Sequence, residues 1–131
     1  MPSSIPVVVA GALGRMGAEV IKAVVEATDC KLVGAVDNTL GKEGCDIGLE
    51  LGLGELEVAI TADFEGCLCA VSQSVRDSNS AAVLVDFTHP SVVYEHTRAA
   101  IAYGVHPVIG TTGLSPEQLS DLSQFSAKAS I

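Results

Sequence analysis

Aromatic residues and positive charges are scarce in this sequence of 131 residues. Tryptophan is absent and aromatic residues make up 4% of the chain. Seven lysines and arginines stand against sixteen acidic residues, which gives a formal net charge of −9. Such a surface repels nucleic-acid backbones and anionic lipids, so we expect neither nucleic acid nor a membrane as a partner. A phosphate group could be attracted only locally, by a loop or a helix end.

Long apolar runs and targeting features are also missing. No run approaches the roughly 18 apolar residues that a membrane-spanning helix needs. The first ten residues lack the basic segment of a secretory signal and the Arg-rich character of a transit peptide. These absences predict a soluble, cytoplasmic protein.

The four cysteines show neither the pattern of a disulfide framework nor that of a metal site. They are Cys30, Cys45, Cys67 and Cys69. The last two are not accompanied by a second Cys or His pair at ligand spacing. We therefore expect reduced thiols and no bound metal.

The remaining composition favours a single compact domain. Hydrophobic residues make up 48% of the chain and charged residues 18%. At this length the chain can bury roughly two thirds of its unfolded surface in one core, but a second independent core is not expected.

The first third of the chain predicts a strand, a helix and a second strand. Residues Ile5–Ala10 form an apolar run without alternation, which is typical of a parallel strand buried on both faces. From Arg15 the apolar residues recur at helical spacing. Leu32–Val36 is again strand-like, so this part of the chain predicts a βαβ unit.

The middle of the chain gives weaker signals. Residues 38–57 contain five glycines among scattered leucines and acids, which predicts an irregular loop. Glu57–Thr61 is a weak strand candidate. The segment CLCAVSQ, residues 67–73, fits a short helix or a short strand, and its periodicity does not decide between them.

The last third repeats the alternation of strands and helices. Ala82–Phe87 predicts a strand, and Pro90 predicts the first residue of a helix that runs to about Tyr103. Residues 108–110 predict another strand. Ser115 and Gln118 then have the spacing of a capping box, so a final helix is expected, with a buried stripe of Leu119, Leu122, Phe125 and Ala129.

Strands that alternate with helices predict an α/β fold. We expect a Rossmann-like, doubly wound and mostly parallel sheet with helices on both faces. Ligands of such folds bind outside the carboxyl ends of the strands. The turns after Ala10, Val36, Phe87 and Ile109 lie at these ends, so we expect them to meet at one crevice.

Three glycines follow the first predicted strand in the stretch GALGRMG. Gly11 permits a tight turn, Gly14 leaves room for a diphosphate, and Gly17 lets the helix pack closely. The spacing is GxxGxxG rather than GxGxxG. The same glycines could serve only as a strand-to-helix turn, and that alternative stays open at this point.

Two charged residues near this turn favour dinucleotide binding. Asp37 ends the second strand, where a carboxylate can accept hydrogen bonds from the adenine ribose. Its alternative role is that of an ordinary turn aspartate. Arg15 can pair with the diphosphate or with the 2′-phosphate of NADP, or it can pair with Glu19 on the helix surface.

Together the segments GALGRMG, VDFTHP and VIGTTG, in this order at three strand ends, resemble the dihydrodipicolinate reductase family. The resemblance covers nearly the whole chain but only the family's amino-terminal half. It implies that residues 1–131 form an NAD(P)-binding domain without the carboxyl-terminal substrate and catalytic domain. The implied cofactor is NADH or NADPH, and the implied activity is hydride transfer to a cyclic imine dicarboxylate in lysine (diaminopimelate) biosynthesis.

The resemblance also implies which residues bind the cofactor. The phosphates would be held by Gly11, Ala12, Leu13, Gly14, Arg15 and Met16, and the adenine ribose by Asp37. The nicotinamide ribose would lie beside Phe87 and Thr88, and the nicotinamide beside the turn of Gly110, Thr111 and Thr112, which also faces the substrate. Asn38 stands where family members carry a basic residue, although Lys42 could substitute for it.

No catalytic residue is expected in this chain, because the family's proton donors belong to the second domain. We predict that His89 caps a helix or faces solvent, and that His96 and His106 are structural. The family forms homo-oligomers through its second domain, which leaves open whether this chain alone is a monomer. A stand-alone dinucleotide- or CoA-binding regulatory module without catalysis is the main alternative, and an acidic flavodoxin-like signalling domain is a weaker one.

Overall fold

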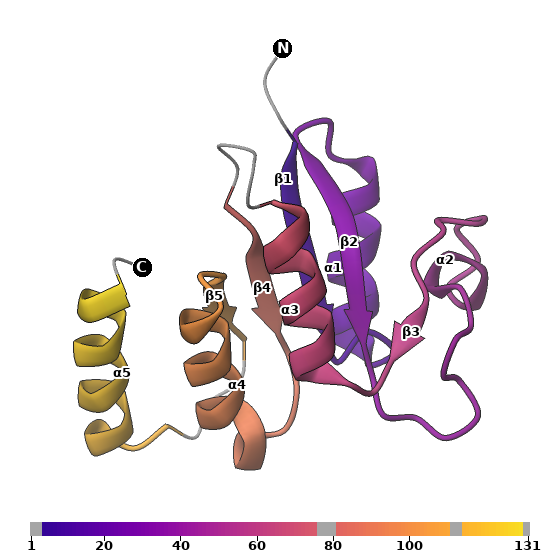
Figure 1. Ribbon diagram of the computed structural model, residues 1–131. Coiled ribbons are helices and arrows are strands. Elements are labelled where there is room, and N and C mark those ends of the chain that lie inside the picture. The colour runs from indigo at the N-terminus through magenta and orange to yellow at the C-terminus, as the bar shows by residue number, and fades with distance from the viewer. Residues whose placement is uncertain (1–3, 76–80, 111–113, 130–131) are drawn as a thin grey trace.

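Five parallel strands form a single sheet in the computed structural model (Figure 1), which describes residues 4–75, 81–110 and 114–129. The order across the sheet is β3-β2-β1-β4-β5, and every pair of neighbours is parallel. The strands are β1 (Ile5–Ala10), β2 (Cys30–Val36), β3 (Ile60–Thr61), β4 (Val83–Asp86) and β5 (His106–Ile109). The predicted Rossmann-like fold class is therefore confirmed.

The central strand β1 separates two hydrophobic clusters. Val7 and Val9 belong to the cluster with α1 (Arg15–Glu26) and the short α2 (Ile47–Glu50). Val8 and Ala10 belong to the cluster with α3 (Phe64–Ser74) and α4 (Pro90–Ala102). Because successive residues of a strand point to opposite faces, the apolar run of β1 supplies both sides of the sheet. The two groups of helices lie on opposite faces (Figure 1).

Several predicted helix boundaries are confirmed. Helix α4 begins at Pro90, and its chain turns at Gly104 with a φ of 74°. The capping box of α5 (Pro116–Ala129) is present in both directions. The Gln118 N–H donates to the Ser115 hydroxyl at 3.1 Å, and the Ser115 N–H donates to the Gln118 side-chain oxygen at 3.0 Å.

Residues 38–57 are more ordered than the prediction of an irregular loop. Helix α2 interrupts this segment, and Asp46 is the residue that organises it. Its carboxylate accepts hydrogen bonds from the amides of Leu49, Leu56 and Val58, each at 3.0 Å. These bonds lower the pKa of Asp46, the bond from Leu56 most strongly, although desolvation acts in the opposite direction. The glycine-rich composition predicted a loop and gave no signal for the hydrogen bonds that Asp46 accepts.

The structure settles one open prediction and corrects another. The stretch CLCAVSQ is helical and forms most of α3. The buried stripe predicted for α5 is wrong at Leu119, which is 53% exposed, whereas Leu122 is buried. Within the described residues α5 packs beside α4, where Arg98 lies over the Phe125 ring at 4.4 Å and pairs with Asp121 at 3.0 Å.

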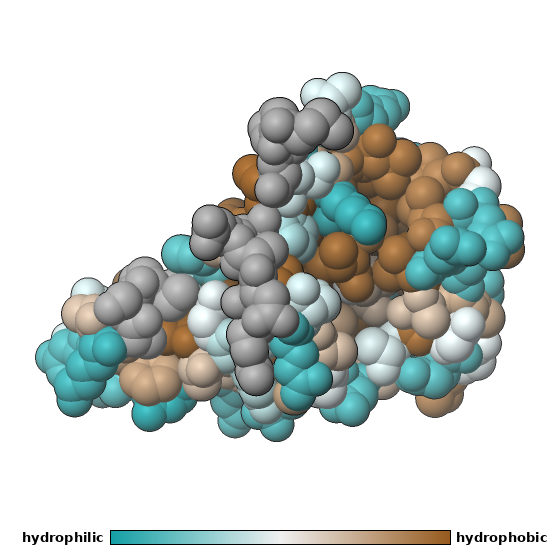
Figure 2. Space-filling model, turned by 45° about the horizontal axis from the view of Figure 1, so that its top comes forward, coloured by the Kyte–Doolittle hydropathy of each residue, from teal (hydrophilic) through white to brown (hydrophobic). Residues whose placement is uncertain are grey.

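The surface seen from the amino-terminal ends of the strands mixes hydrophilic and hydrophobic residues (Figure 2). A hollow of about 220 Å³ lies between the end of α1 and the start of β2, lined by Val24, Val25, Cys30, Lys31, Leu32 and Leu56. All four cysteines are free thiols. Among the described helices, none combines the length and the apolar character that crossing a membrane requires.

The turn between β1 and α1 brings two stretches of main chain into direct contact. Gly11 has a φ of 80°, which L side chains rarely adopt. A Cβ atom on Gly17 would lie 2.0 Å from the Gly11 carbonyl oxygen. Both features agree with the tight turn and the close packing that the sequence predicted for these glycines.

Replacing Gly17 by alanine should therefore destabilise the fold, because the added methyl group displaces the turn. We expect Gly17→Ala to lower the free energy of unfolding by about 1–3 kcal/mol, as overpacking does, measured by urea denaturation. Alanine has the higher helix propensity, so the effect has the opposite sign to propensity. The reverse change Ala23→Gly, on the exposed face of α1, should cost about 1 kcal/mol from propensity alone. A Gly17→Ala chain that is more stable than the wild type would contradict the contact.

Candidate functional site

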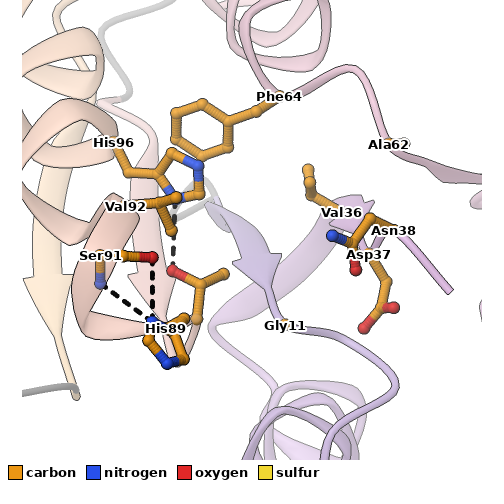
Figure 3. A pocket seen from close by; sticks show the side chains of 11 residues that line it. Gly11, Val36, Asp37, Asn38, Ala62, Phe64, His89, Ser91, Val92 and His96 are labelled. Atoms are coloured by element: carbon orange, nitrogen blue, oxygen red, sulfur yellow. Dashed lines mark hydrogen bonds between the residues drawn. The ribbon is translucent and has the colours of Figure 1, made fainter.

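A cavity of about 360 Å³ opens at the carboxyl ends of β1, β2 and β4. Its lining comes from three places: the strand ends, the start of α3, and the first two turns of α4 (Figure 3). The lining residues are Gly11, Val36, Asp37, Asn38, Ala62, Phe64, Thr88, His89, Ser91, Val92 and His96. The structure thus brings together three of the four strand ends that the sequence predicted to meet, those after Ala10, Val36 and Phe87, whereas no described residue at the end of β5 lines the cavity.

The amides of residues 11–14 all donate hydrogen bonds inside the protein. Those of Gly11 and Ala12 donate to the Val36 carbonyl, that of Leu13 to the Asp37 carboxylate at 2.9 Å, and that of Gly14 to the Gly11 carbonyl. The amides of Arg15, Met16 and Gly17, at the start of α1, have no partner among the described residues. The predicted phosphate-binding segment therefore offers its free N–H groups at its end and not along its whole length.

Gly14 is the N-cap of α1 and leaves the approach to these amides open. A Cβ atom built on Gly14 would have one neighbour within 4 Å, the Gly11 carbonyl oxygen at 3.2 Å. No side chain caps the helix. The first turn of α1 thus combines unpaired N–H groups with the positive end of the helix dipole.

Arg15 and Met16 are exposed beside this helix end. The alternative pairing of Arg15 with Glu19 is not observed, because Glu19 pairs with Lys22 at 3.5 Å. Within the described residues Arg15 makes no ion pair. Its guanidinium is therefore available to an anion at the start of α1.

Ala12 and Leu13 are placed differently from the other residues of the turn. Ala12 is fully buried in the core, and its amide already has a partner, so its side chain cannot touch a ligand. Leu13 packs against the same core cluster. These two residues shape the turn that leads into α1.

Asp37 lies in the cavity wall where β2 ends. Its Oδ2 accepts from the Leu13 amide, and its Oδ1 accepts from the amide and the hydroxyl of Thr39. The neighbouring Asn38 also lines the cavity. Lys42, the possible substitute for a basic residue at position 38, pairs with Glu50 at 2.9 Å.

The predicted nicotinamide-side residues lie around the ends of β4 and β5. Thr88 lines the cavity, whereas Phe87 does not. The Gly110 amide donates to the Asp86 carbonyl at 2.9 Å, and a Cβ atom on Gly110 would lie 2.0 Å from the Phe87 ring. Phe87 and Gly110 are thus in close contact. Thr111 and Thr112 lie outside the described residues.

Asp86 and His96 form a polar cluster that the sequence analysis missed. Asp86 is the last residue of β4 and is fully buried. Its Oδ1 accepts from the amide of Thr88 at 2.9 Å and from the Thr88 hydroxyl, and its Oδ2 lies 3.2 Å from Nδ1 of His96. Desolvation raises the pKa of Asp86, but the hydrogen bonds from His96 and Thr88 outweigh it, so the net pKa is lowered. Asp86 is therefore an ionised carboxylate near neutral pH.

Phe64 completes this wall of the cavity. Its ring stacks on the His96 imidazole with a centroid distance of 3.8 Å and an interplanar angle of 16°. His96 is 19% exposed and lines the cavity, so the prediction that it is purely structural is incomplete. The prediction for His89 is confirmed: it caps α4, and its Nδ1 accepts from the Ser91 amide at 3.1 Å.

The sequence held one signal for this cluster. Asp86 is a charged residue at the end of an apolar strand, inside the segment VDFTHP. A carboxylate in such a position needs a partner when it is buried. His96 and Phe64 had no comparable signal, because their contact depends on how α3 and α4 pack against each other.

This strand order and the open glycine turn define a Rossmann-like nucleotide-binding fold. The chain belongs to the dihydrodipicolinate reductase family: residues 5–131 match the family described as "Dihydrodipicolinate reductase, N-terminus". The resemblance inferred from the three sequence segments is confirmed.

Curated relatives support the same family. The 4-hydroxy-tetrahydrodipicolinate reductase of Synechococcus sp. (strain CC9605) is 87% identical over 131 residues, which is 100% of this chain and 47% of that protein. The protein of the same name from Parasynechococcus marenigrum (strain WH8102) is 88% identical, again over 100% of this chain and 47% of the relative. The chain thus spans about half the length of these relatives.

Solved structures agree with the fold. A dipicolinate-bound dihydrodipicolinate reductase from Paenisporosarcina sp. TG-14 has a TM-score of 0.73 and 26% identity, covering 98% of this chain and 45% of that one. The WlbA (WbpB) dehydrogenase from Thermus thermophilus, in complex with NAD and UDP-GlcNAcA, has a TM-score of 0.74 and 20% identity, covering 96% of this chain and 39% of that one. The second likeness concerns the fold alone.

Asp86→Asn should destabilise the chain, because an amide group would face donors that now point at a carboxylate. We expect a loss of about 2–3 kcal/mol in the free energy of unfolding at pH 7, measured by urea denaturation. The exposed control Asp29→Asn, which removes the same charge, should change it by less than about 0.5 kcal/mol.

The pH dependence provides a second readout for the same variant. Because the folded-state pKa of Asp86 is lowered, its stabilising contribution is present above the unfolded value of about 4 and is lost as the pH falls through the folded value. The difference between the wild type and Asp86→Asn should therefore narrow below about pH 4. A difference that stays constant down to acid pH would contradict an ionised Asp86.

Proposed function

We propose that this chain is the NAD(P)H-binding half of a 4-hydroxy-tetrahydrodipicolinate reductase. Residues 1–131 form the nucleotide-binding domain, and the substrate and catalytic domain lies outside them. The observation that carries the proposal is the start of α1, where three amides without a partner in the described part of the chain follow Gly14, beside the cavity that holds Asp37. Family membership gives the reaction, which is hydride transfer to a cyclic imine dicarboxylate of lysine biosynthesis.

The start of α1 suits the diphosphate of a dinucleotide. The amides of Arg15, Met16 and Gly17 can donate to phosphate oxygens, and Gly14 has no side chain to block them. The exposed Arg15 guanidinium adds a positive charge. These groups supply a local attraction that the net charge of −9 does not supply.

Asp37 retains room for a ribose hydroxyl. A carboxylate offers about four lone-pair sites, and the three hydrogen bonds from Leu13 and Thr39 leave one of them open. A free 2′-hydroxyl, as in NADH, can use that site. NADPH is also included in the proposal, because Arg15 has no ion partner among the described residues and can pair with a 2′-phosphate.

The nicotinamide end of the cofactor is proposed to lie toward β4 and β5. Phe87, Thr88 and Gly110 border this end, and the family resemblance adds Thr111 and Thr112, which lie outside the described residues. When bound, the cofactor supplies the hydride. The residues of this chain bind and orient it, and the proton donors belong to the missing half. We therefore propose that this chain alone has little or no turnover.

The remaining properties follow from the family. The small partners are the dinucleotide and a dicarboxylate substrate, and the setting is the cytoplasm, without nucleic acid or membrane. We propose that the whole protein forms a homo-oligomer through its second domain.

Gly14→Val is the first test, because it adds a branched side chain where the diphosphate approaches. At a φ of −72° valine is tolerated, and its Cβ meets one atom, the Gly11 carbonyl oxygen at 3.2 Å, so we expect the chain to stay folded at a modest cost in stability, which urea denaturation checks. We expect no measurable NADH binding in a nicotinamide fluorescence titration at concentrations that saturate the wild type. Ala23→Val, on the exposed face of the same helix, should bind normally. Unchanged binding by Gly14→Val, or competition by CoA in the wild type, would refute the proposed site.

Asp37→Ala is the second test, because it removes the proposed acceptor for the adenine ribose. The variant should lose about 1–2 kcal/mol of NADH affinity, the scale of a charge-assisted hydrogen bond. NADPH should lose less, since its 2′-phosphate does not benefit from a carboxylate. Asp29→Ala, which removes an exposed charge from the other end of the sheet, is the control. Equal losses for both cofactors would argue against a direct contact with the 2′-hydroxyl.

A further inference from the structure

The imidazole of His96 is held in one orientation by a buried partner. Its Nδ1 lies 3.2 Å from Oδ2 of Asp86 and 3.3 Å from the Thr88 hydroxyl oxygen. The stacked Phe64 ring fixes the plane of the imidazole. An ionised carboxylate can only accept a hydrogen bond, so Nδ1 carries a hydrogen.

The other ring nitrogen is left for a ligand. Nε2 has no hydrogen-bond partner among the described residues and lies on the side of the ring that faces the cavity (Figure 3). With the hydrogen fixed on Nδ1, a neutral imidazole presents an acceptor lone pair at Nε2. Asp86 thus fixes the tautomer of a histidine that faces the cavity.

The cavity between Asp37 and His96 has the character of a site for a flat base. Its walls include the apolar side chains of Val36, Phe64 and Val92. Asp37 and Asn38 stand on one side, and Ser91, Val92 and His96 of α4 stand on the other (Figure 3). A nucleobase attached to a ribose at Asp37 would enter this space.

Charge decides which part of the nucleotide can meet His96. A second hollow shares Ala62, Phe64 and His96 with this cavity and is also lined by Asp63, Glu65 and Glu95. Together with the buried Asp86 at Nδ1, acidic residues of β4, α3 and α4 thus lie near the imidazole. A phosphate at Nε2 would be repelled, whereas a neutral amino group would not be.

We propose that His96 binds the adenine of the dinucleotide, with Nε2 accepting a hydrogen bond from the 6-amino group, and that Asp86 is the positioning residue that holds Nδ1. This inference rests on the proposed function, because it places the adenine ribose at Asp37. It makes His96 a residue that reads the identity of the base.

Deamino-NADH tests this contact, since its hypoxanthine base carries a 6-oxo group, which cannot donate to Nε2, in place of the 6-amino group of adenine. The wild-type chain should bind NADH about tenfold more tightly than deamino-NADH, the scale of one net hydrogen bond, in titrations at pH 8.5 where histidine side chains are generally neutral. Two variants separate ligand contact from a structural role. An asparagine at position 96 can place its amide nitrogen where Nδ1 donates to Asp86, but it has no group at the position of Nε2. A glutamine can place its amide at the position of Nε2, but it has no group at the position of Nδ1.

His96→Asn should therefore stay folded but lose the preference for NADH, binding both dinucleotides equally. His96→Gln should be less stable in urea denaturation but should keep part of the preference. His106→Gln, an exposed histidine at the start of β5, is the matched control and should behave as the wild type.

Three results would overturn the inference. A wild-type chain without preference would show that the 6-amino group is not recognised, and a preference retained by His96→Asn would show that Nε2 is not used. A loss confined to NADPH in His96→Asn would assign His96 to the 2′-phosphate. In each case the proposed function would stand if the wild-type chain binds NADH and Gly14→Val does not. A wild-type chain that binds neither NADH nor deamino-NADH would overturn both the inference and the proposed function.

Discussion

The contact between the main chains of Gly11 and Gly17 is the constraint on which the site depends. A side chain at position 17 would meet the Gly11 carbonyl at 2.0 Å, so only a bare backbone allows α1 to start this close to the end of β1. The Leu13 amide is then within reach of Asp37, which ties the turn to β2. The amides in the first turn of a helix have no acceptor within the helix, and no side chain of the described residues caps α1. These amides therefore stay free at the position that the glycine contact sets.

Two strand ends use the same local device. In Asp37-Asn38-Thr39 and in Asp86-Phe87-Thr88, the aspartate Oδ1 accepts from the amide and the hydroxyl of the threonine two residues later. In both cases Oδ2 is turned toward another element: the Leu13 amide for Asp37 and the His96 imidazole for Asp86. Each acid thus closes its own turn and holds a second element: the turn between β1 and α1 for Asp37, and the His96 side chain of the cavity wall for Asp86. The two sides of the cavity are built by one pattern, D-x-T, that occurs after β2 and again in β4.

The sequence predicted the elements whose signals are local. The apolar run of β1, Pro90 at the start of α4 and the capping box at Ser115 depend on neighbouring residues, and the structure has them all. The signals failed where distant residues decide the outcome. Asp46 orders the glycine-rich segment by bonds to amides up to twelve residues away, and Leu119 is exposed because the face it lies on is not covered within the described chain. The position of His96 in the cavity wall likewise depends on how α3 and α4 pack, which the spacing of residues in the sequence does not predict.

The double engagement of Asp37 has a consequence for how cofactor selectivity can change. Asp37, which we propose contacts the adenine ribose, also accepts a hydrogen bond from the Leu13 amide, so replacing it disturbs the turn that leads into α1. A substitution at Asn38 would therefore change the cavity at a smaller cost in stability, because Asn38 lines the cavity without such a bond among the described residues. Redesign of this domain for another nucleotide should begin there, with the acid left in place as part of the scaffold.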